Sequence, residues 1–355
     1  MKEGKLYMKL GYVSEIPRKV NNAGAKARQD LNSILYKRYG KGVANCAATN
    51  SNNIFEKIAY VLNPKNLVNF LKLYSVKEEY LVLQYPLVFG ANRLLQCAYS
   101  NALKKNHPVL IVHDINILRG YGNRSLEDEV NVYNNCRAII VHNNSMKRRL
   151  SEVGVVVPML TIDLFDYLVK EDIPCNKYNF GKEVVFAGNI AKSKFLEDEE
   201  LGKLPIQFNL YGDGVGINTR TTSFLNVKYY GSLAPDELPY KLKGSFGLIW
   251  DGNSVNTCDG GEGKYLKVNN PHKLSLYIVS AIPVIVWKEA AVAKFIEEHK
   301  IGITINSLSE ISDKIDALGE EGYNQLLVNL KELQRKVSQG YYLNSVLDKV
   351  EKMFE

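Results

Sequence analysis

Residues 269–286 have the sequence NNPHKLSLYIVSAIPVIV, and this stretch decides the fold class. A polar loop with Pro271, His272 and Lys273 predicts the start of a helix, and small residues before Pro283 predict a turn into a buried strand. The first turn of such a helix offers free backbone N–H groups and the positive end of the dipole, to which Lys273 adds a full charge. The stretch therefore predicts a diphosphate site in an α/β sheet. The alternative is a helix–strand unit in which Pro and Lys occur by chance.

The same alternation of short apolar runs and longer helix-like segments extends along the whole chain and predicts a doubly wound α/β architecture. We expect strands at 5–13, 41–47, 79–86, 108–114, 137–143 and 155–159, and then at 182–189, 206–212, 226–231, 246–252, 282–287 and 301–306. The polar segment 170–183 separates the two series, so the interdomain connection is predicted at about 158–181. The predicted domains are 1–160, joined by a final helix at 339–355, and 161–338.

Length and composition agree with two packed domains. The chain has 355 residues, 46% of them apolar and 23% charged, which excludes a disordered or fibrous protein. Five scattered cysteines without CxxC spacing exclude a zinc site and a disulfide framework, and they predict the reduced thiols of a cytoplasmic protein. The N-terminus lacks the apolar core of a signal peptide, and no apolar run reaches the roughly 20 residues that span a bilayer. The net charge of +7 suits an anionic partner such as a nucleotide diphosphate, or is an ordinary basic surface.

Two strand ends of the second half carry further candidates for the diphosphate site. VVFAGNIAKSKFL, residues 184–196, predicts a strand that ends at Gly188 and Asn189 and a helix start with Lys192. FNLYGDG, residues 208–214, places Tyr211 and Gly212 at a strand end, where the ring would stack on a uracil base or only cover the sheet edge. The glycines at 212–216 have the wrong spacing for a dinucleotide fingerprint, which argues against NAD.

The segment 229–252, YYGSLAPDELPYKLKGSFGLIWDG, adds Trp250 and Asp251 at the carboxyl end of a strand as sugar or ribose contacts. The glycine-rich segment 258–270 is predicted to form a lid. The predicted nucleotide-sugar contacts are Gly188, Asn189, Lys192, Tyr211, Gly212, Trp250, Asp251, Asn270, Pro271, His272, Lys273 and Tyr277.

The first half offers candidates for the acceptor side of the reaction. The loop 14–30 opens a helix, and we expect it to contact the acceptor or the donor phosphate through Asn22, Gly24, Lys26 and Arg28. VLIVHDINILRG, residues 109–120, places His113 and Asp114 at a strand end. We predict Asp114 as the general base, with His113 as the alternate. The competing interpretation is that Asp114 caps the next turn and His113 is a buried, hydrogen-bonded histidine.

These motifs resemble one group of bacterial sugar transferases. YVSEIPRKVNNAGAKARQD, LQYP, VHDINILRG, VHNNSMKRRL, FAGNIAKSKFL, YGDG and NNPHKLSLY are similar to the GT-B transferases that extend glycans on serine-rich-repeat adhesins and to β-1,6-galactofuranosyltransferases. Ala281 stands where many members have Gly. The resemblance implies the GT-B fold, with two Rossmann-like domains facing a cleft and a last helix returning to the first domain. It also implies a UDP-sugar donor, no cofactor or bound metal, and a homo-oligomer; the absence of any D-x-D tripeptide agrees with a leaving group stabilised by Lys273.

The resemblance leaves several functions open. The first is an inverting transfer of glucose from UDP-glucose to a GlcNAc-bearing glycan on an adhesin, and the second is transfer of galactofuranose or another hexose in capsule or cell-wall synthesis. A non-catalytic nucleotide-sugar-binding subunit is the alternative from another class, whereas an epimerase would need the missing fingerprint. We expect a glycan or glycoprotein acceptor and no nucleic-acid partner. Membrane association is at most peripheral, through Lys147–Arg149, unless that cluster is only a solvated helix face.

Overall fold

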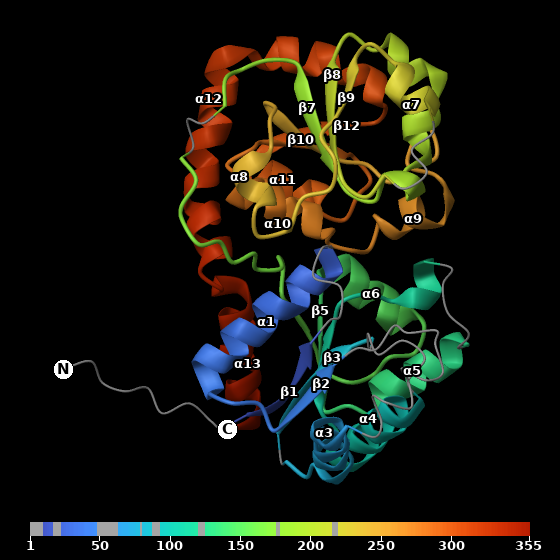
Figure 1. Ribbon diagram of the computed structural model, residues 1–355, viewed down its shortest axis with the longest axis vertical. Coiled ribbons are helices and arrows are strands. Elements are labelled where there is room, and N and C mark those ends of the chain that lie inside the picture. The colour runs from blue at the N-terminus through green and yellow to red at the C-terminus, as the bar shows by residue number, and fades with distance from the viewer. Residues whose placement is uncertain are drawn as a thin grey trace, which may run out of the picture.

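The computed structural model describes residues 10–16, 23–47, 63–78, 80–86, 93–119, 125–174, 178–214 and 219–355. Within these residues the chain forms two six-stranded parallel sheets, one in each half of the molecule, with helices packed around them (Figure 1). The strand orders are β2-β1-β3-β4-β5-β6 and β12-β11-β10-β7-β8-β9. Connections leave in opposite directions on the two sides of β1 and of β7, so the chain is doubly wound, as predicted.

The strands are short apolar runs. In the first sheet they are β1 (Gly11–Ile16), β2 (Ala44–Ala47), β3 (Leu81–Tyr85), β4 (Val109–Val112), β5 (Ala138–Val141) and β6 (Met159–Thr161). In the second they are β7 (Glu183–Ala187), β8 (Gln207–Tyr211), β9 (Val227–Tyr229), β10 (Phe246–Ile249), β11 (Val284–Trp287) and β12 (Gly302–Ile305). β3, β4 and β5 are buried at every position, because helices cover both faces of a parallel sheet.

Helices follow the strands in both halves. The first half contains α1 (Ala23–Tyr39), α3 (Pro64–Ser75), α4 (Arg93–Asn106), η1 (Asn116–Arg119), α5 (Leu126–Asn134) and α6 (Asn144–Glu152). The second contains η2 (Ile190–Lys192), η3 (Lys194–Glu197), η4 (Glu199–Lys203), α7 (Thr219–Ser223), α8 (Leu238–Lys241), α9 (Gly260–Tyr265), α10 (His272–Val279), α11 (Ala293–His299) and η5 (Leu308–Glu310). Two further helices follow, α12 (Ile311–Ser338) and α13 (Tyr341–Phe354).

The last helix returns to the first domain, as expected. Gly340 takes a left-handed conformation with φ of 75° and separates α13 from α12. The carboxylate of Asp166 caps α13, because it accepts hydrogen bonds from the N–H groups of Tyr342 at 3.1 Å and Leu343 at 2.8 Å. Further along α13, Glu351 forms an ion pair with Arg38 of α1. Figure 1 shows α13 beside α1 and the first sheet.

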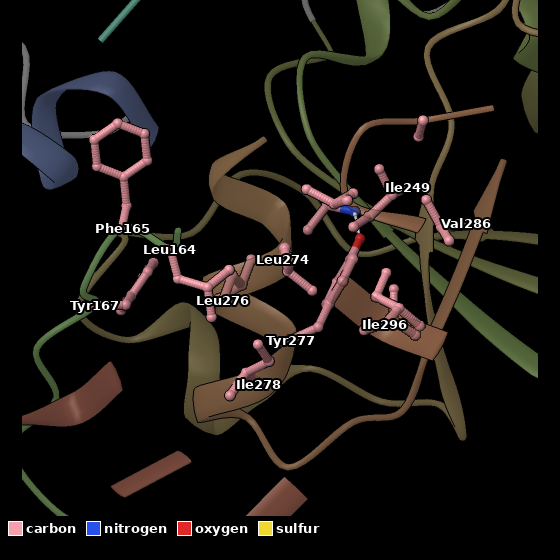
Figure 2. Packing of buried hydrophobic residues seen from close by; sticks show 14 of the residues in the cluster. Leu164, Phe165, Tyr167, Ile249, Leu274, Leu276, Tyr277, Ile278, Val286 and Ile296 are labelled. Carbon is pink, nitrogen blue, oxygen red and sulfur yellow. Dashed lines mark hydrogen bonds between the residues drawn. The ribbon is translucent and has the colours of Figure 1, made fainter. Parts of the chain in front are cut away.

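The hydrophobic core is continuous across the two halves. Leu164, Phe165 and Tyr167 of the connecting segment belong to the same buried cluster as the helix α10 and the second sheet. In Figure 2, Leu276 lies on the side of α10 toward the connecting segment, whereas Tyr277 points toward the sheet. The helix that opens with Lys273 is therefore held from two sides.

Three predicted elements differ from the structure. The strand expected at 155–159 is β6, Met159–Thr161, because Pro158 has no N–H group to donate to the ladder and pairing becomes regular only after it. The segment 258–270, expected to be a lid, contains the helix α9, and its Tyr265 is buried in a core cluster of the first domain. The strand expected at 5–13 is β1, Gly11–Ile16, and residues 1–9 lie outside the described part of the chain.

Among the helices that the structure describes, none is long and apolar enough to cross a membrane.

Candidate active site

The best-formed candidate site lies at the switch point of the second sheet. β7 and β10 are neighbouring parallel strands whose connections leave in opposite directions. Gly188 follows β7 and Asp251 follows β10 by two residues, so both lie at the carboxyl edge of the sheet. Ligands of open α/β sheets bind in the crevice that this reversal creates.

Lys273 of α10 reaches this edge. Its Nζ atom lies 2.5 Å from Oδ1 of Asp251 and 4.6 Å from the ring centroid of Phe186, and its side chain is 15% exposed. The N-cap residue of α10, Pro271, makes no side-chain cap hydrogen bond. A positive charge and a helix start without a side-chain cap thus stand at one point of the carboxyl edge of the sheet, which is the arrangement that favours a phosphate.

Two glycines permit the close approach of these elements. A Cβ atom at Gly188 would lie 3.1 Å from Cε of Lys273. Gly212 has φ of 147°, and a Cβ atom there would lie 1.7 Å from the carbonyl oxygen of Gly188. A side chain at Gly212 is therefore incompatible with this backbone, whereas one at Gly188 would press on Lys273.

Three predicted donor contacts are buried instead of lining an open surface. Tyr277 has no exposed area, and its hydroxyl accepts from the N–H of Ala187 at 3.0 Å and donates within the sheet. Trp250 is also fully buried, with its indole N–H on the carbonyl of Ser254. The ring of Tyr211 is 2% exposed and stacks on Tyr230 at 5.0 Å. These three side chains belong to the packed interior of the second domain. Direct contact with a nucleotide sugar stays a prediction for each of them.

The remaining candidates of the second domain divide into two groups. Asn189 caps η2 by accepting from the N–H of Lys192, whose side chain is exposed near the same edge. Asn270 instead joins the domains: its amide donates to the carbonyls of His142 and Asp163 at 2.9 and 2.6 Å, and it accepts from Asn143. The polar atoms of the Asn270 side chain are thus engaged by the first domain.

His272 lies between the domains. Its ring centroid is 5.1 Å from that of Tyr167 and 6.1 Å from that of Phe165. Both ring nitrogens are buried, and neither meets a hydrogen-bond partner among the described residues. Burial lowers the pKa of His272 to about 3, the charge of Lys26 adds to the decrease, and the nearby main chain of Asp166 opposes it. The ring is therefore neutral at pH 7.

On the first domain, His113 and Asp114 follow β4 as predicted. The Nε2 atom of His113 lies 2.8 Å from the side-chain oxygen of Gln84, and its ring stacks on Phe165 at 5.5 Å. Burial, with the charge of Arg28, lowers the pKa of His113 well below its usual value. Asp114 forms an ion pair with Arg119 at 3.0 Å and keeps 37% of its side chain exposed. Burial raises the pKa of Asp114 and the charge of Arg119 opposes the increase. An increase in this direction makes the carboxylate a better proton acceptor.

Lys26 and Arg28 of α1 are paired within the protein. Lys26 is buried against Asp30 at 2.7 Å and reaches Asp236 of the second domain at 2.9 Å. Arg28 pairs with buried Glu15 and donates to the carbonyl of Pro86. Gly24 is exposed in the first turn of α1, and Asn22 lies outside the described residues. Phosphate or acceptor contact by these four residues stays a prediction.

Sequence reasoning missed a second connection between the domains. Arg119 contacts Asp114 of its own domain and Glu262 of α9 at 3.2 Å, while the hydroxyl of Tyr265 accepts from the N–H of Ile115 at 2.8 Å. The segment TIDLFDYLV, residues 161–169, supplies Phe165 and Tyr167 to the interface. The apolar and aromatic residues of this segment were the available signal, although the sequence placed it only within the predicted interdomain connection at about 158–181.

Two doubly wound domains and a last helix that returns to the first of them are the features of the GT-B fold. The architecture is similar to that of sucrose-phosphate synthase from Thermosynechococcus elongatus, with a TM-score of 0.63 and 11% identity over 97% of this chain and 98% of that one. It is also similar to the Anabaena protein HepE in complex with UDP-glucose, with a TM-score of 0.56 and 13% identity over 98% and 99% of the two chains.

Sequence comparison names the family. The model of the glucosyltransferase 3-like N-terminal domain matches residues 11–164, and that of the C-terminal domain matches residues 184–350. The chain belongs to this glucosyltransferase 3-like family. It is 32% identical to the β-1,6-galactofuranosyltransferase WbbI of Escherichia coli K12 over 93% of this chain and 94% of that protein. It is 27% identical to glucosyltransferase 3 of Streptococcus gordonii over 67% and 69% of the two chains.

Proposed function

We propose that the chain transfers a hexose from a UDP-sugar to a glycan acceptor, with inversion at the anomeric carbon and without a metal ion. The observation that carries the proposal is the position of Lys273 at the switch point, 2.5 Å from Asp251 and at the start of α10. A diphosphate at this edge would meet the ammonium group and the N–H groups of the first helical turn together. Such donors stabilise the negative charge that develops on a leaving diphosphate.

In the proposed reaction, an acceptor hydroxyl oxygen attacks the anomeric carbon while the bond from that carbon to the diphosphate breaks. UDP leaves with the bonding electron pair, and the hydroxyl proton passes to a carboxylate. Asp114 is the proposed base, because it is partly exposed and its pKa is raised by burial. Lys273 and the start of α10 stabilise the departing charge.

The sugar that is transferred has two candidates. Galactofuranose is supported by the relative that aligns with 93% of the chain at 32% identity. Glucose is supported by the family match and by a relative that aligns with 67% of the chain at 27% identity. A GlcNAc-bearing adhesin glycan as the acceptor of glucose rests on the sequence resemblance alone. The longer and closer alignment favours the furanose donor. A nucleotide-sugar-binding subunit without turnover is the non-enzymatic alternative.

A donor panel tests the proposal. Purified protein is incubated in EDTA with UDP-galactofuranose, UDP-glucose, UDP-galactose or UDP-GlcNAc and with a panel of glycan acceptors, including GlcNAc-modified peptide. We expect transfer from one hexose donor, and NMR of the product to show the anomeric configuration opposite to that of the donor. Lys273→Ala is compared with Lys182→Ala, since Lys182 pairs with Asp316 away from the switch point. Binding of UDP without turnover would select the subunit alternative, and unchanged UDP affinity in Lys273→Ala would refute the site.

A further inference from the structure

The helix α3 exposes an unusual number of apolar side chains. Leu67, Val68, Leu71 and Tyr74 are 48%, 49%, 52% and 43% exposed, and we name these four side chains the α3 face. The only buried residue within α3 is Leu73. Figure 1 shows α3 and α4 at the end of the first domain that is farthest from the second sheet. The α3 face is therefore remote from the interdomain site.

Helical geometry gathers these side chains on one surface. At 100° per residue, positions 67, 71 and 74 fall within about 60° of one another, and position 68 lies at the border of the same stripe. The opposite side holds α3 in place, since Leu73 is buried there and Tyr74 offers its backbone carbonyl to Asn101 of α4 at 2.6 Å. The α3 face thus belongs to an ordered helix that already packs on its other side.

Positive charge surrounds the α3 face on both flanks. Lys65 and Lys72 are exposed along one border of the stripe. On the other side, Nζ of Lys105 from α4 lies 5.2 Å from the ring centroid of Tyr74, and Lys104 beside it is exposed. Neither α3 nor α4 contains an aspartate or glutamate. An aliphatic stripe between lysines whose long stems reach outward is typical of a helix that lies in a membrane interface.

Two other occupants fit this surface less well. A second copy of the chain docked through the same face would bring the lysines of both copies together, with no carboxylate in α3 or α4 to pair with them. A nucleic acid would match the charge but would leave the Leu67, Val68 and Leu71 side chains without suitable partners, because it is contacted mainly through hydrogen bonds and ion pairs. An anionic lipid surface matches both the charge and the aliphatic stripe.

We infer that the α3 face docks the enzyme on an anionic lipid bilayer, with the leucines in the headgroup–acyl boundary and the lysines on lipid phosphates. This surface is distinct from the cluster Lys147–Arg149 of α6, which has no exposed large apolar neighbour within its helix. Docking through α3 would leave the interdomain site open to an acceptor held at the membrane surface.

Vesicle sedimentation of the full chain tests the inference. We expect the protein to sediment with vesicles of phosphatidylcholine containing phosphatidylglycerol, and to do so several-fold less with phosphatidylcholine alone or at high salt. Leu67→Gln/Leu71→Gln and Lys65→Gln/Lys72→Gln should each weaken binding by about tenfold or more. Matched controls are Val328→Gln on α12, where Val328 is 66% exposed, and Lys294→Gln on α11, where the Lys294 side chain is 83% exposed. Neither control should change sedimentation.

Each contrary result is informative. Absence of sedimentation, equal sedimentation with both lipids, or wild-type binding by either double variant would overturn the inference. Gel filtration runs in parallel: a dimer that Leu67→Gln/Leu71→Gln converts to a monomer, without vesicle binding, would identify a second copy as the occupant. Melting temperatures of the variants establish that they are folded. The readout does not depend on transfer activity, so the inference and the proposed function can fail separately.

Discussion

The switch points of the two sheets use charge in opposite ways. Between β7 and β10, Lys273 and Asp251 are 15% and 28% exposed, and they contact each other at the carboxyl edge of the sheet. Beside β1 and β3, Arg28 and Glu15 are 5% and 3% exposed, and Arg28 also holds the carbonyl of Pro86. A partly exposed pair can exchange one partner for a ligand, whereas a buried pair is costly to open. The switch point is thus a candidate ligand site in the second domain, whereas in the first domain it holds a buried ion pair that stabilises the fold.

The largest expected effect comes from breaking the buried pair. Arg28→Ala should lower the free energy of unfolding by about 3–5 kcal/mol, because it leaves the Glu15 carboxylate buried without its partner. Glu15→Leu/Arg28→Met removes both charges and should recover most of that loss. Urea unfolding followed by circular dichroism measures both. If Arg28→Ala kept wild-type stability but raised the KM for the donor, the first switch point would also be a ligand site.

The exposed pair should show the reverse behaviour. Lys273→Ala should reduce kcat/KM by about 100- to 1,000-fold, as expected for loss of one donor to a developing negative charge. Its free energy of unfolding should change by less than about 1 kcal/mol, since a partly exposed ion pair contributes little to stability. Steady-state kinetics and urea unfolding on one preparation separate the two quantities. A large loss of stability would mean that Lys273, like Arg28, mainly stabilises the fold.

His272 lies between the two domains, and the pH dependence of the free energy of unfolding tests whether its ring is buried and neutral. Its pKa is lowered from 6.5 to about 3 in the folded chain, so between these values the unfolded chain binds more protons. Stability from this residue is therefore present above pH 6.5 and is lost as the pH falls. The loss approaches about 1.4 kcal/mol per pH unit.

His272→Phe should remove that slope and leave stability at pH 7 equal or higher, because the ring nitrogens have no hydrogen-bond partner among the described residues. Unfolding titrations at pH 7, 6 and 5 make the comparison with the wild type. His142, whose pKa is lowered to about 4 by burial, provides the control through His142→Asn, which should remove a slope of the same sign. An unchanged slope in His272→Phe would mean that the ring is solvated.

The smallest effect tests how tightly Lys273 is positioned. Gly188→Ala would place a Cβ atom 3.1 Å from Cε of Lys273, and a flexible side chain can move by the few tenths of an ångström required. We expect the KM for the donor to rise by about 2- to 5-fold, less than 1 kcal/mol in binding, with stability unchanged. Gly181→Ala, which would meet the side chain of Ser245 at 3.3 Å away from the site, is a control of similar crowding. Equal effects from both variants would mean that the rise in KM does not come from contact between residue 188 and Lys273.

Much of the donor edge was predictable from local pattern. The strand ends at Gly188 and Asp251 and the helix start at Lys273 each follow from a short apolar run beside polar or small residues. Parallel sheets bring the carboxyl ends of neighbouring strands to one edge, so the three residues had to meet once the strand order was right. The burial of Tyr211, Trp250 and Tyr277 was not predictable in this way, because a tyrosine or tryptophan at a strand end or in a helix has the same pattern whether it faces a ligand or the core.

The sequence by itself determined the two doubly wound domains, the break at Gly340 before a last helix and the lysine at a helix start, because each depends on periodicity and on residues close together in the chain. The return of that helix to the first domain was expected from the family resemblance. Only the tertiary structure decided that Lys26 and Arg28 form buried ion pairs within the protein and that Asn270 joins the domains. It also decided that α9 packs against the first domain through Tyr265. Their partners lie up to 210 residues away, as from Lys26 to Asp236. A charge in the sequence is the same whether its counter-ion is a ligand or a distant carboxylate, and only folding brings that carboxylate within reach.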